Sequence, residues 1–509
     1  MARQINAQTI GMRPQMKFCT PAQLSRLHNA ALHILERTGL VIHCSEALDL
    51  LGEIGCWLDK GQRVRIPSHI VDQALARTPG RISVYNRQGD PAMLLEGLNS
   101  YYGPGPTIQY VYDVYSRKRR ASDREDIQRA ATVCDYLPNI DFAMTMGMTG
   151  GVDPKSKGIN PALTDRLDFA AMLGHTQKPL IFSAWSREGL ADIWDMAVAV
   201  RGSEEQAGRQ PLMILFTQPI SPLVIDTEPV RQLFFCAEKG IPAIFSSAPT
   251  MGSTAPNSIA GSVAQALAEF FGALVLSQFK NPGAPVIMGA GYGPMDFRKA
   301  SSPYNGPEFY VSKTINKELA AYYGLPDWNY GGCTDAKILD GQATATAEAA
   351  LSLYVATSAG SNLIHDVGYM EMGMTACLEL LVMADELISG FKKMFAEILM
   401  DDESLGWDMF DRVGPGLARQ FDLNGSFGMS TNVASPFNVA YEEIPGARWV
   451  DPTTMPTTMP EAPPGGFPQT PPVAASVITM SIDGALETPS SHVVNVAIGR
   501  QFGRDFSAE

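Results

Sequence analysis

Short apolar runs alternate with longer amphipathic segments along most of the chain, and this alternation is the clearest pattern in the sequence. From residue 98, each apolar run is followed by a loop rich in Gly, Pro and Thr and then by apolar residues at helical spacing. Runs that are apolar throughout are typical of parallel strands covered by helices. The predicted strands are SYYGPGPTIQYVYDV, IDFAMTMG, KPLIFSAW, PLMILFTQ, IPAIFSSA, APVIMGAG, DWNYGGC and SNLIHDVG.

About eight strand–helix units of this kind close naturally into a (β/α)8 TIM barrel, a fold of the α/β class. We place this barrel at residues 98–420. A doubly wound open sheet is the competing topology, because it is also built from alternating strands and helices. The barrel is preferred because the number of units matches its closure.

Three further segments flank the predicted barrel. Residues 1–19 are expected to be a flexible N-terminus, and residues 20–97 an α/β cap that begins with a helix capped by Thr20 and stopped by Gly39. Residues 421–509 are rich in Pro and Thr and are expected to form an irregular, largely disordered tail. Short strands are expected there only in VITMSID or HVVNVAIG.

Composition and charge exclude several classes of function. The formal charge of −14 makes nucleic acids and anionic membranes poor partners. The N-terminus lacks an apolar signal core and no run of 18 apolar residues occurs, so a cytoplasmic location is expected. Seven scattered cysteines, with neither CxxC nor HExxH, argue against a disulfide framework and a zinc site, so no protein-held metal is predicted.

The active site of such a barrel lies at the carboxyl ends of its strands, which directs attention to the residues that follow each apolar run. His365 is the one histidine of seven at a predicted strand end, although a histidine there can also serve only to orient a loop. The candidates with side chains suited to binding or catalysis are Tyr102, Gln109, Asp113, Trp185, Gln218, Tyr292, Arg298, Tyr330, Asp335, His365 and Tyr369.

Aromatic residues are frequent among these candidates. Several aromatic faces around one point bind a quaternary ammonium group by cation–π attraction, although each ring alone is more often ordinary packing at a barrel mouth. The glycine-rich stretches YYGPGPT, MTGGVDP and GAGYGP match no nucleotide-binding pattern. They are expected to be loops that let the backbone approach a ligand closely.

Several stretches, in the same order, resemble the trimethylamine methyltransferase family, specifically homologues without pyrrolysine. The resemblance covers residues 20–420 and rests on RIPSHIVDQAL, YDVYSRKRRASDREDIQRAATVCDYLPNIDF, YGPMDFRKASSPYNGPEFYV, YGGCTDAKILDGQATATAEAALS, AGSNLIHDVGYMEMG and DRVGPG. It implies a barrel enzyme that moves a methyl group from a methylated amine to cob(I)alamin, giving methylcob(III)alamin on a separate small corrinoid protein. It also implies glycine betaine or a related quaternary amine as the substrate, and a homo-oligomer is expected.

The resemblance suggests roles for the candidate residues. Asp113 or Asp335 is the expected carboxylate beside the ammonium group, and His365 is expected to contact the substrate carboxylate, the corrinoid or the departing amine. Arg298 is the expected anchor for a substrate carboxylate, because a guanidinium binds carboxylate in bidentate fashion, although a surface arginine is an equal alternative. The remaining candidates are expected to bind the substrate. They are Tyr102, Gln109, Trp185, Gln218, Tyr292, Tyr330 and Tyr369.

Other functions stay open from the sequence. The substrate could be trimethylamine or another methylamine, and the barrel could instead be a metal-dependent hydrolase or lyase that uses His365, Asp366 and Asp335. Few histidines lie at strand ends, which argues against a metal cluster. A binding barrel disabled by its altered tail is a third reading. The tail departs from the family after DRVGPG, and we hypothesise a frameshift, which fails if neither other reading frame restores a helical continuation.

Overall fold

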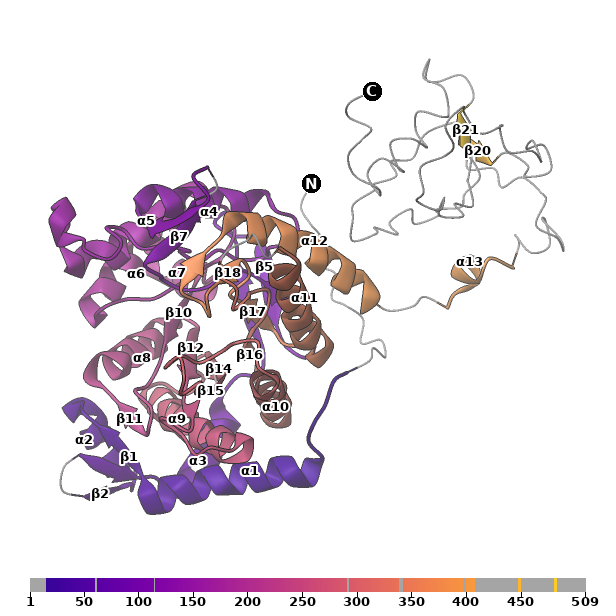
Figure 1. Ribbon diagram of the computed structural model, residues 1–509. Coiled ribbons are helices and arrows are strands. Elements are labelled where there is room, and N and C mark those ends of the chain that lie inside the picture. Colours follow the sequence, from indigo (N-terminus) through magenta and orange to yellow (C-terminus); the bar gives the residue numbers. More distant parts are fainter. Residues whose placement is uncertain are drawn as a thin grey trace. The chain divides into compact units, whose positions relative to one another are not determined.

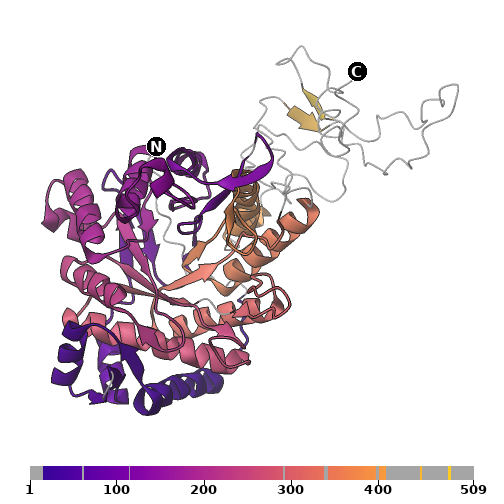
Figure 2. The same ribbon diagram turned by 60° about the vertical axis from the view of Figure 1, so that its left-hand side comes forward.

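The structure is a computed structural model that describes residues 15–59, 62–113, 115–290, 293–337, 342–396, 400–407, 447–449 and 480–482. The chain divides into two units, Met1–Glu397 and Ile398–Glu509. Strands surrounded by helices form the body of the first unit (Figure 1). The N-terminal helices lie together at one end of it, as both views show (Figure 2).

Parallel strands in the first unit close into a complete barrel. Seven strands pair in the order β6–β17–β16–β14–β12–β10–β9, and residues 141–143 join the two edges. The amide of Asp141 donates to the carbonyl of Tyr102 at 2.6 Å, and the amide of Ala143 donates to that of Pro179 at 2.9 Å. An open sheet has two unpaired edges, so this closure confirms the (β/α)8 barrel. The strands are β6 (Tyr101–Tyr102), β9 (Leu180–Phe182), β10 (Met213–Thr217), β12 (Ala243–Ser247), β14 (Val286–Ala290), β16 (Asp327–Tyr330) and β17 (Leu363–His365).

A helix follows each barrel segment and covers its outer face. Several helices begin at a side-chain cap, such as Asp123 with Asp126 before α4 and Ser258 before α9, and others end at a left-handed glycine such as Gly324 after α10. These local signals make the boundaries readable from the sequence. The helices are α4 (Arg124–Tyr136), α5 (Thr164–His175), α6 (Arg187–Arg201), α8 (Thr227–Lys239), α9 (Ile259–Lys280), α10 (Pro307–Tyr323), α11 (Gln342–Ala359) and α12 (Leu378–Met394).

The first predicted strand is wrong in one respect. SYYGPGPTIQYVYDV was predicted as one strand, but the barrel strand β6 ends at Tyr102. Gly103-Pro104-Gly105-Pro106 follow, and prolines, which cannot donate to a ladder, interrupt the pairing. The rest of the stretch forms β7 (Tyr110–Asp113), which joins a separate sheet with β8 (Lys118–Ala121), β18 (Tyr369–Met370) and β19 (Thr375–Ala376).

The interior of the barrel is filled at its amino end. Inward side chains of the strands form one cluster with the hairpin of β4 (Ile82–Tyr85) and β5 (Pro91–Leu95). The amide of Tyr85 donates to the carbonyl of Pro211, just before β10 begins, so the hairpin plugs the amino end. A ligand must therefore enter from the carboxyl end. The cluster comprises Ile82, Val84, Met93, Leu95, Phe142, Met144, Ile181, Ile214, Ile244, Ile287, Trp328 and Leu363.

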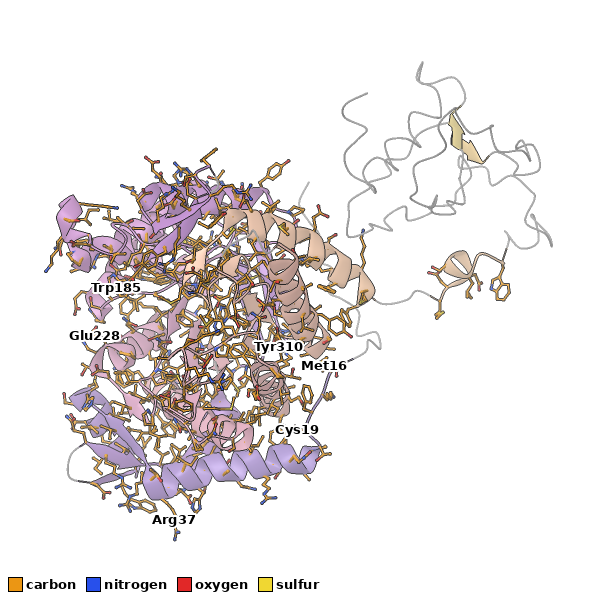
Figure 3. The ribbon with its side chains drawn as sticks, in the orientation of Figure 1. Met16, Cys19, Arg37, Trp185, Glu228 and Tyr310 are labelled. Atoms are coloured by element: carbon orange, nitrogen blue, oxygen red, sulfur yellow. The ribbon has the colours of Figure 1, made fainter. Side chains whose placement is uncertain are left out.

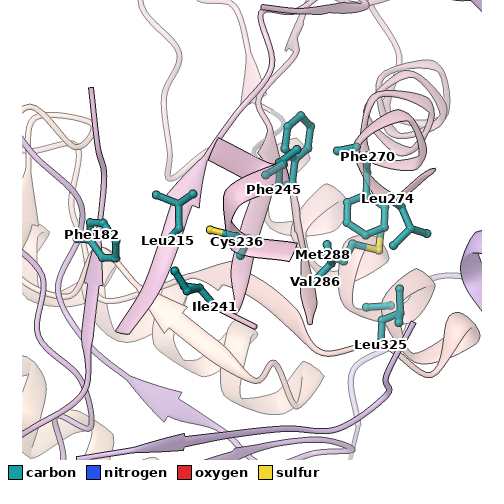
Figure 4. Close-up of a cluster of buried hydrophobic side chains, with 14 of the residues drawn as sticks. Phe182, Leu215, Cys236, Ile241, Phe245, Phe270, Leu274, Val286, Met288 and Leu325 are labelled. Carbon is teal, nitrogen blue, oxygen red and sulfur yellow. The ribbon is translucent and has the colours of Figure 1, made fainter. Parts of the chain in front are cut away.

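A larger core lies between the strands and the helices. Figure 4 shows Leu215 and Phe245 of neighbouring strands among side chains that include Phe270 and Leu274 of α9. Helix α9 is the one helix within the described residues that is long and apolar enough to cross a membrane. Its most apolar window is 83% buried inside the protein, so it serves as a core helix.

The residues of the predicted N-terminal cap form two separate structures. Besides the plugging hairpin, it contains a small sheet in the order β11–β1–β3–β2, where β11 (Val224–Ile225) comes from the loop after β10. Gly272 lets α9 approach this sheet, since a Cβ there would lie 2.2 Å from Leu40. The other elements are α1 (Pro21–His33), a π-helical segment at Ile34–Thr38, β1 (Leu40–Ile42), α2 (Ser45–Glu53), β2 (Trp57–Asp59), β3 (Arg63–Arg65) and α3 (Ser68–Arg77).

Only short elements are described in the second unit. Helix α13 covers Asp402–Leu405, and β20 (Ala447–Trp449) pairs antiparallel with β21 (Met480–Ile482). Strand β21 lies inside the predicted VITMSID strand. The predicted HVVNVAIG strand and nearly all of the Pro/Thr-rich stretch lie outside the described residues.

Candidate active site

The carboxyl end of β17 holds a buried histidine–aspartate pair inside the barrel mouth. Nδ1 of His365 lies 2.8 Å from Oδ1 of Asp366. Because a carboxylate only accepts hydrogen bonds, Nδ1 donates and Nε2 keeps its lone pair. The imidazole also stacks on the indole of Trp328, with ring centroids 3.9 Å apart and planes within 5°. The carboxylate and the indole together fix the orientation of the imidazole.

The electrostatics keep this imidazole neutral. Burial lowers the pKa of His365 below its ordinary 6.5, the nearby charge of Asp366 opposes this effect, and the charge of Lys313 adds to it. At neutral pH, His365 is therefore an uncharged acceptor backed by a carboxylate. Such a pair directs negative potential into the mouth without placing a bare anion there.

Tyrosine rings line the surroundings of this pair. The Tyr330 ring meets the imidazole edge to face at 5.9 Å, and Tyr304 packs edge-on against Tyr330 at 4.8 Å. The Tyr369 hydroxyl donates to the carbonyl of Pro106. Burial raises the pKa of all three tyrosines, and the charge of Asp366 raises it further, so their hydroxyls stay neutral. The wall is aromatic and uncharged at physiological pH.

Gly105 brings the loop after β6 close to the pair. A Cβ at this position would lie 2.0 Å from Oδ1 of Asp366 and 2.6 Å from the Tyr369 ring, so no other residue fits without displacing them. This is the close backbone approach that the stretch YYGPGPT predicts. Asp366 itself has a left-handed backbone, with φ of 67°, which turns the chain sharply after the strand.

Lys313 of α10 supplies a buried positive charge beside the pair. Its ammonium lies 5.7 Å from the centre of the Tyr330 ring and 5.4 Å from that of Phe309. Burial lowers the pKa of Lys313 to about 8, while the charges of Asp366 and Asp327 oppose the effect. Lys313 and Asp366 thus place opposite charges near Tyr330 in a region of low dielectric.

Removing this charge is expected to raise the pKa of His365. In Lys313→Met, the repulsion that disfavours the imidazolium is lost, so the imidazole should bind a proton more tightly, by up to about one pH unit. Histidine-labelled NMR titration measures this directly. Lys299→Met, an exposed change, is the control and should leave the titration unmoved. An unchanged His365 titration in Lys313→Met would contradict the assignment.

The structure brings together only some of the predicted site residues. His365, Tyr330 and Tyr369 share the mouth, as described above. Tyr102 is fully buried, but its hydroxyl lies 2.9 Å from that of Thr357, so the ring faces helix α11 rather than the mouth. Asp335 is nearby in a supporting position, because its carboxylate accepts from the amides of Tyr304 (3.1 Å) and Asn305 (3.0 Å). It thereby holds the loop after β14 over the site.

Asp113 lies apart from this group because β6 ends before it. Its carboxylate accepts from the amide and hydroxyl of Ser116 and pairs with Arg120 at 3.1 Å. The bonds to Ser116 and Arg120 lower the pKa of Asp113 to about 2. It lines a surface groove of about 560 Å³ beside α4, which does not include His365. Asp113 therefore stabilises the turn between β7 and β8.

The other predicted residues lie toward the outside. Gln109, Gln218 and Arg298 are exposed, and Arg298 sits in a turn where its amide donates to Asp296. Trp185 is 44% exposed and lies toward the outside of the first unit (Figure 3). Its indole N–H donates to the hydroxyl of Thr164 at 2.7 Å. Tyr292 lies outside the described residues. The sequence located the ends of β16 and β17 correctly but could not give the direction of loop side chains.

Two important neighbours of His365 were missed. Trp328 lies two residues before Tyr330 on β16, so the period of two in a strand could have placed both on one face. Lys313 lies within a helix, where no strand-end signal marks it. Among the residues described, no group of three or more His, Cys, Asp or Glu side chains gathers as a metal site would require.

Comparison with known proteins agrees with this architecture. The family model described as trimethylamine methyltransferase (MTTB) matches residues 2–421, ending where the Pro/Thr-rich tail begins. Trimethylamine methyltransferase MttB of Desulfitobacterium hafniense (strain DSM 10664 / DCB-2) is 30% identical over 396 residues, 77% of each chain. The glycine betaine methyltransferase of D. hafniense (strain Y51) is 25% identical over 404 residues, 79% of this chain and 82% of the relative.

A solved structure resembles the chain more distantly. The monomethylamine methyltransferase MtmB of Methanosarcina barkeri is 11% identical, with a TM-score of 0.47 over 79% of this chain and 81% of that one. The match to the family model covers the whole barrel and contains the His365 segment. The chain belongs to the trimethylamine methyltransferase (MTTB) family and is a methyl-transferring enzyme.

Proposed function

We propose that the chain transfers a methyl group from a quaternary amine, of the class of glycine betaine and related betaines, to cob(I)alamin carried by a separate corrinoid protein. Family membership supports methyl transfer, and one relative is named as a glycine betaine methyltransferase. The corrinoid is here a methyl acceptor, a second substrate that meets the barrel from outside, rather than a group that this chain holds.

The observation that carries the proposal is the pair formed by the neutral His365 imidazole and the Asp366 carboxylate in an aromatic mouth. A quaternary nitrogen has no N–H to donate, so it is best held by ring π-systems and by the negative end of a dipole. Nε2 of His365, backed by Asp366 at 2.8 Å, supplies such a dipole. The departing tertiary amine is neutral and needs no proton from the enzyme. The site has only to orient the cation and exclude water.

Charge near the pair favours a betaine over trimethylamine. A betaine carries a carboxylate as well as the ammonium group, and its carboxylate needs a positive partner. The expected anchor, Arg298, is exposed on a turn. Lys313 is buried on the aromatic wall next to Tyr330 and suits that role better. Trimethylamine stays the alternative substrate, because the trimethylamine relative has the higher identity.

The test is methylation of free cob(I)alamin by the purified full chain, followed as loss of the cob(I)alamin absorption band. Glycine betaine, choline, tetramethylammonium and trimethylamine are supplied separately. We expect turnover with glycine betaine, weaker turnover with the cations that lack a carboxylate, and none with trimethylamine. Turnover with trimethylamine alone would assign the alternative substrate. No turnover with any of the four, in a folded preparation, would overturn the proposal.

A further inference from the structure

Two carboxylates outside the central histidine–aspartate pair join helix α11 to two loops of the barrel mouth. Oε2 of Glu348, on α11, accepts from the hydroxyl of Thr334 and, at 2.9 Å, from the amide of Asp335 in the loop after β16. The carboxylate of Asp335 accepts in turn from the amides of Tyr304 (3.1 Å) and Asn305 (3.0 Å) in the loop after β14. We call these two carboxylates and their four hydrogen bonds the carboxylate tie.

The far end of the carboxylate tie fixes a ring of the aromatic wall. The Tyr304 ring stacks on that of Phe309, with centroids 5.1 Å apart and planes within 10°, and meets the Tyr330 ring edge to face at 4.8 Å. Gly373 leaves room for it, since a Cβ there would lie 3.0 Å from the Tyr304 ring. The backbone and the ring of Tyr304 are therefore both held, the backbone by Asp335 and the ring by its aromatic neighbours.

The carboxylate tie has an electrostatic cost. Burial raises the pKa of Asp335, the amides of Asn305 and Tyr304 lower it, and the charge of Glu348 raises it again, because like charges disfavour ionisation. An ionised carboxylate only accepts hydrogen bonds, so its two oxygens suit two successive amides that can only donate. The repulsion between the two carboxylates is thus offset by bonds that position the loops.

We propose that Glu348 is a positioning residue for substrate binding, which acts through Asp335 to hold Tyr304 on the aromatic wall beside Tyr330. The inference rests on the proposed function, since it assigns this wall to a quaternary ammonium group. The positive charge is present in the bound substrate and disappears as the neutral tertiary amine leaves. A lost ring contact therefore weakens binding of the substrate more than it slows the transfer step.

The test compares two substitutions at Glu348 with one at a matched position. Glu348→Ala removes the acceptor, whereas Glu348→Gln keeps a side-chain oxygen for the same two bonds. Glu228 of α8, marked in Figure 3, accepts from the amide of Arg187 at 2.8 Å, so Glu228→Ala breaks a bond of the same kind between a helix and the segment after β9. Each full chain is assayed for kcat and KM with glycine betaine and free cob(I)alamin. Hydrogen exchange is measured at the backbone amides of residues 304 and 305.

We expect Glu348→Ala to raise the KM for glycine betaine by roughly tenfold, the effect of losing one cation–π contact, and to change kcat by less than about threefold. The amides of residues 304 and 305 should exchange faster, because they lose their fixed acceptor. Glu348→Gln and Glu228→Ala should match the wild type in kcat, KM and exchange. An unchanged KM in Glu348→Ala overturns the positioning role, whether or not exchange is faster. An equal rise of KM in Glu348→Gln or Glu228→Ala also overturns it.

Substitution of the ring itself shows whether Glu348 acts through Tyr304. Tyr304→Leu should raise the KM to a similar extent, and Glu348→Ala/Tyr304→Leu should raise it no further, because both changes remove the same contact. Additive increases overturn the route through Tyr304. Thr334→Val removes a donor to Glu348 and gives the same test in a milder form if Glu348→Ala does not fold. If the wild type turns over no quaternary amine, the proposed function fails, while the exchange measurement still decides whether Glu348 holds the loop.

Discussion

His365→Ala is expected to reduce methyl transfer by roughly 10²- to 10³-fold, the usual effect of removing one preorganised electrostatic group from an active site. The variant loses the Nε2 lone pair and the ring that stacks on Trp328 at 3.9 Å. It also leaves the Asp366 carboxylate without its partner at 2.8 Å. The measurement is the initial rate of cob(I)alamin methylation by glycine betaine.

Two further variants separate catalysis from folding. His43→Ala removes an exposed histidine of the cap and should keep both the rate and the melting temperature of the wild type. His365→Ala/Asp366→Asn removes the unpaired buried charge, so it should melt near the wild type while staying inactive. If the His365→Ala enzyme retains more than about a third of the wild-type rate, the imidazole does not take part in methyl transfer.

Lys317→Met is expected to destabilise the barrel by about 3–5 kcal/mol, the cost of breaking a buried ion pair by removing one partner. Lys317 is almost fully buried, and its ammonium donates to Asp327 (3.0 Å), Asn362 (3.0 Å) and the carbonyl of Gly97 (2.9 Å). These groups tie the amino ends of β16 and β17 to the segment after β5. The effect should appear as a lower urea midpoint for the loss of helical circular dichroism.

A surface pair provides the comparison for this substitution. Lys239 pairs with Glu204 at 2.7 Å, but both side chains reach solvent, so Lys239→Met should cost less than about 1 kcal/mol. In Lys317→Met/Asp327→Asn the uncompensated carboxylate is gone, and part of the lost stability should return. If Lys317→Met unfolds at the wild-type midpoint, the ammonium does not hold these strands together.

The strand-end rule accounts for the successes of the sequence prediction. Apolar runs that end in polar or aromatic residues identified β16 and β17, and with them Tyr330 and His365, because parallel strands of one barrel share a carboxyl end. The same rule misplaced Asp113, since the Gly-Pro-Gly-Pro stretch after Tyr102 stops the barrel strand eleven residues earlier. The rule places a residue at the barrel mouth correctly only where the end of the preceding strand has been predicted correctly.

The sequence by itself determined the barrel, its order of strands and helices, and the strand that carries His365. These depend on local periodicity, helix caps and glycine or proline breaks, all of which are properties of short segments. Only the tertiary structure decided that Trp328 stacks on His365, that the charge of Lys313 acts on its pKa, and that Arg298 and Tyr102 face away from it. Contacts between residues far apart in the chain depend on how whole elements pack and where loop side chains point, and no local pattern encodes either of them.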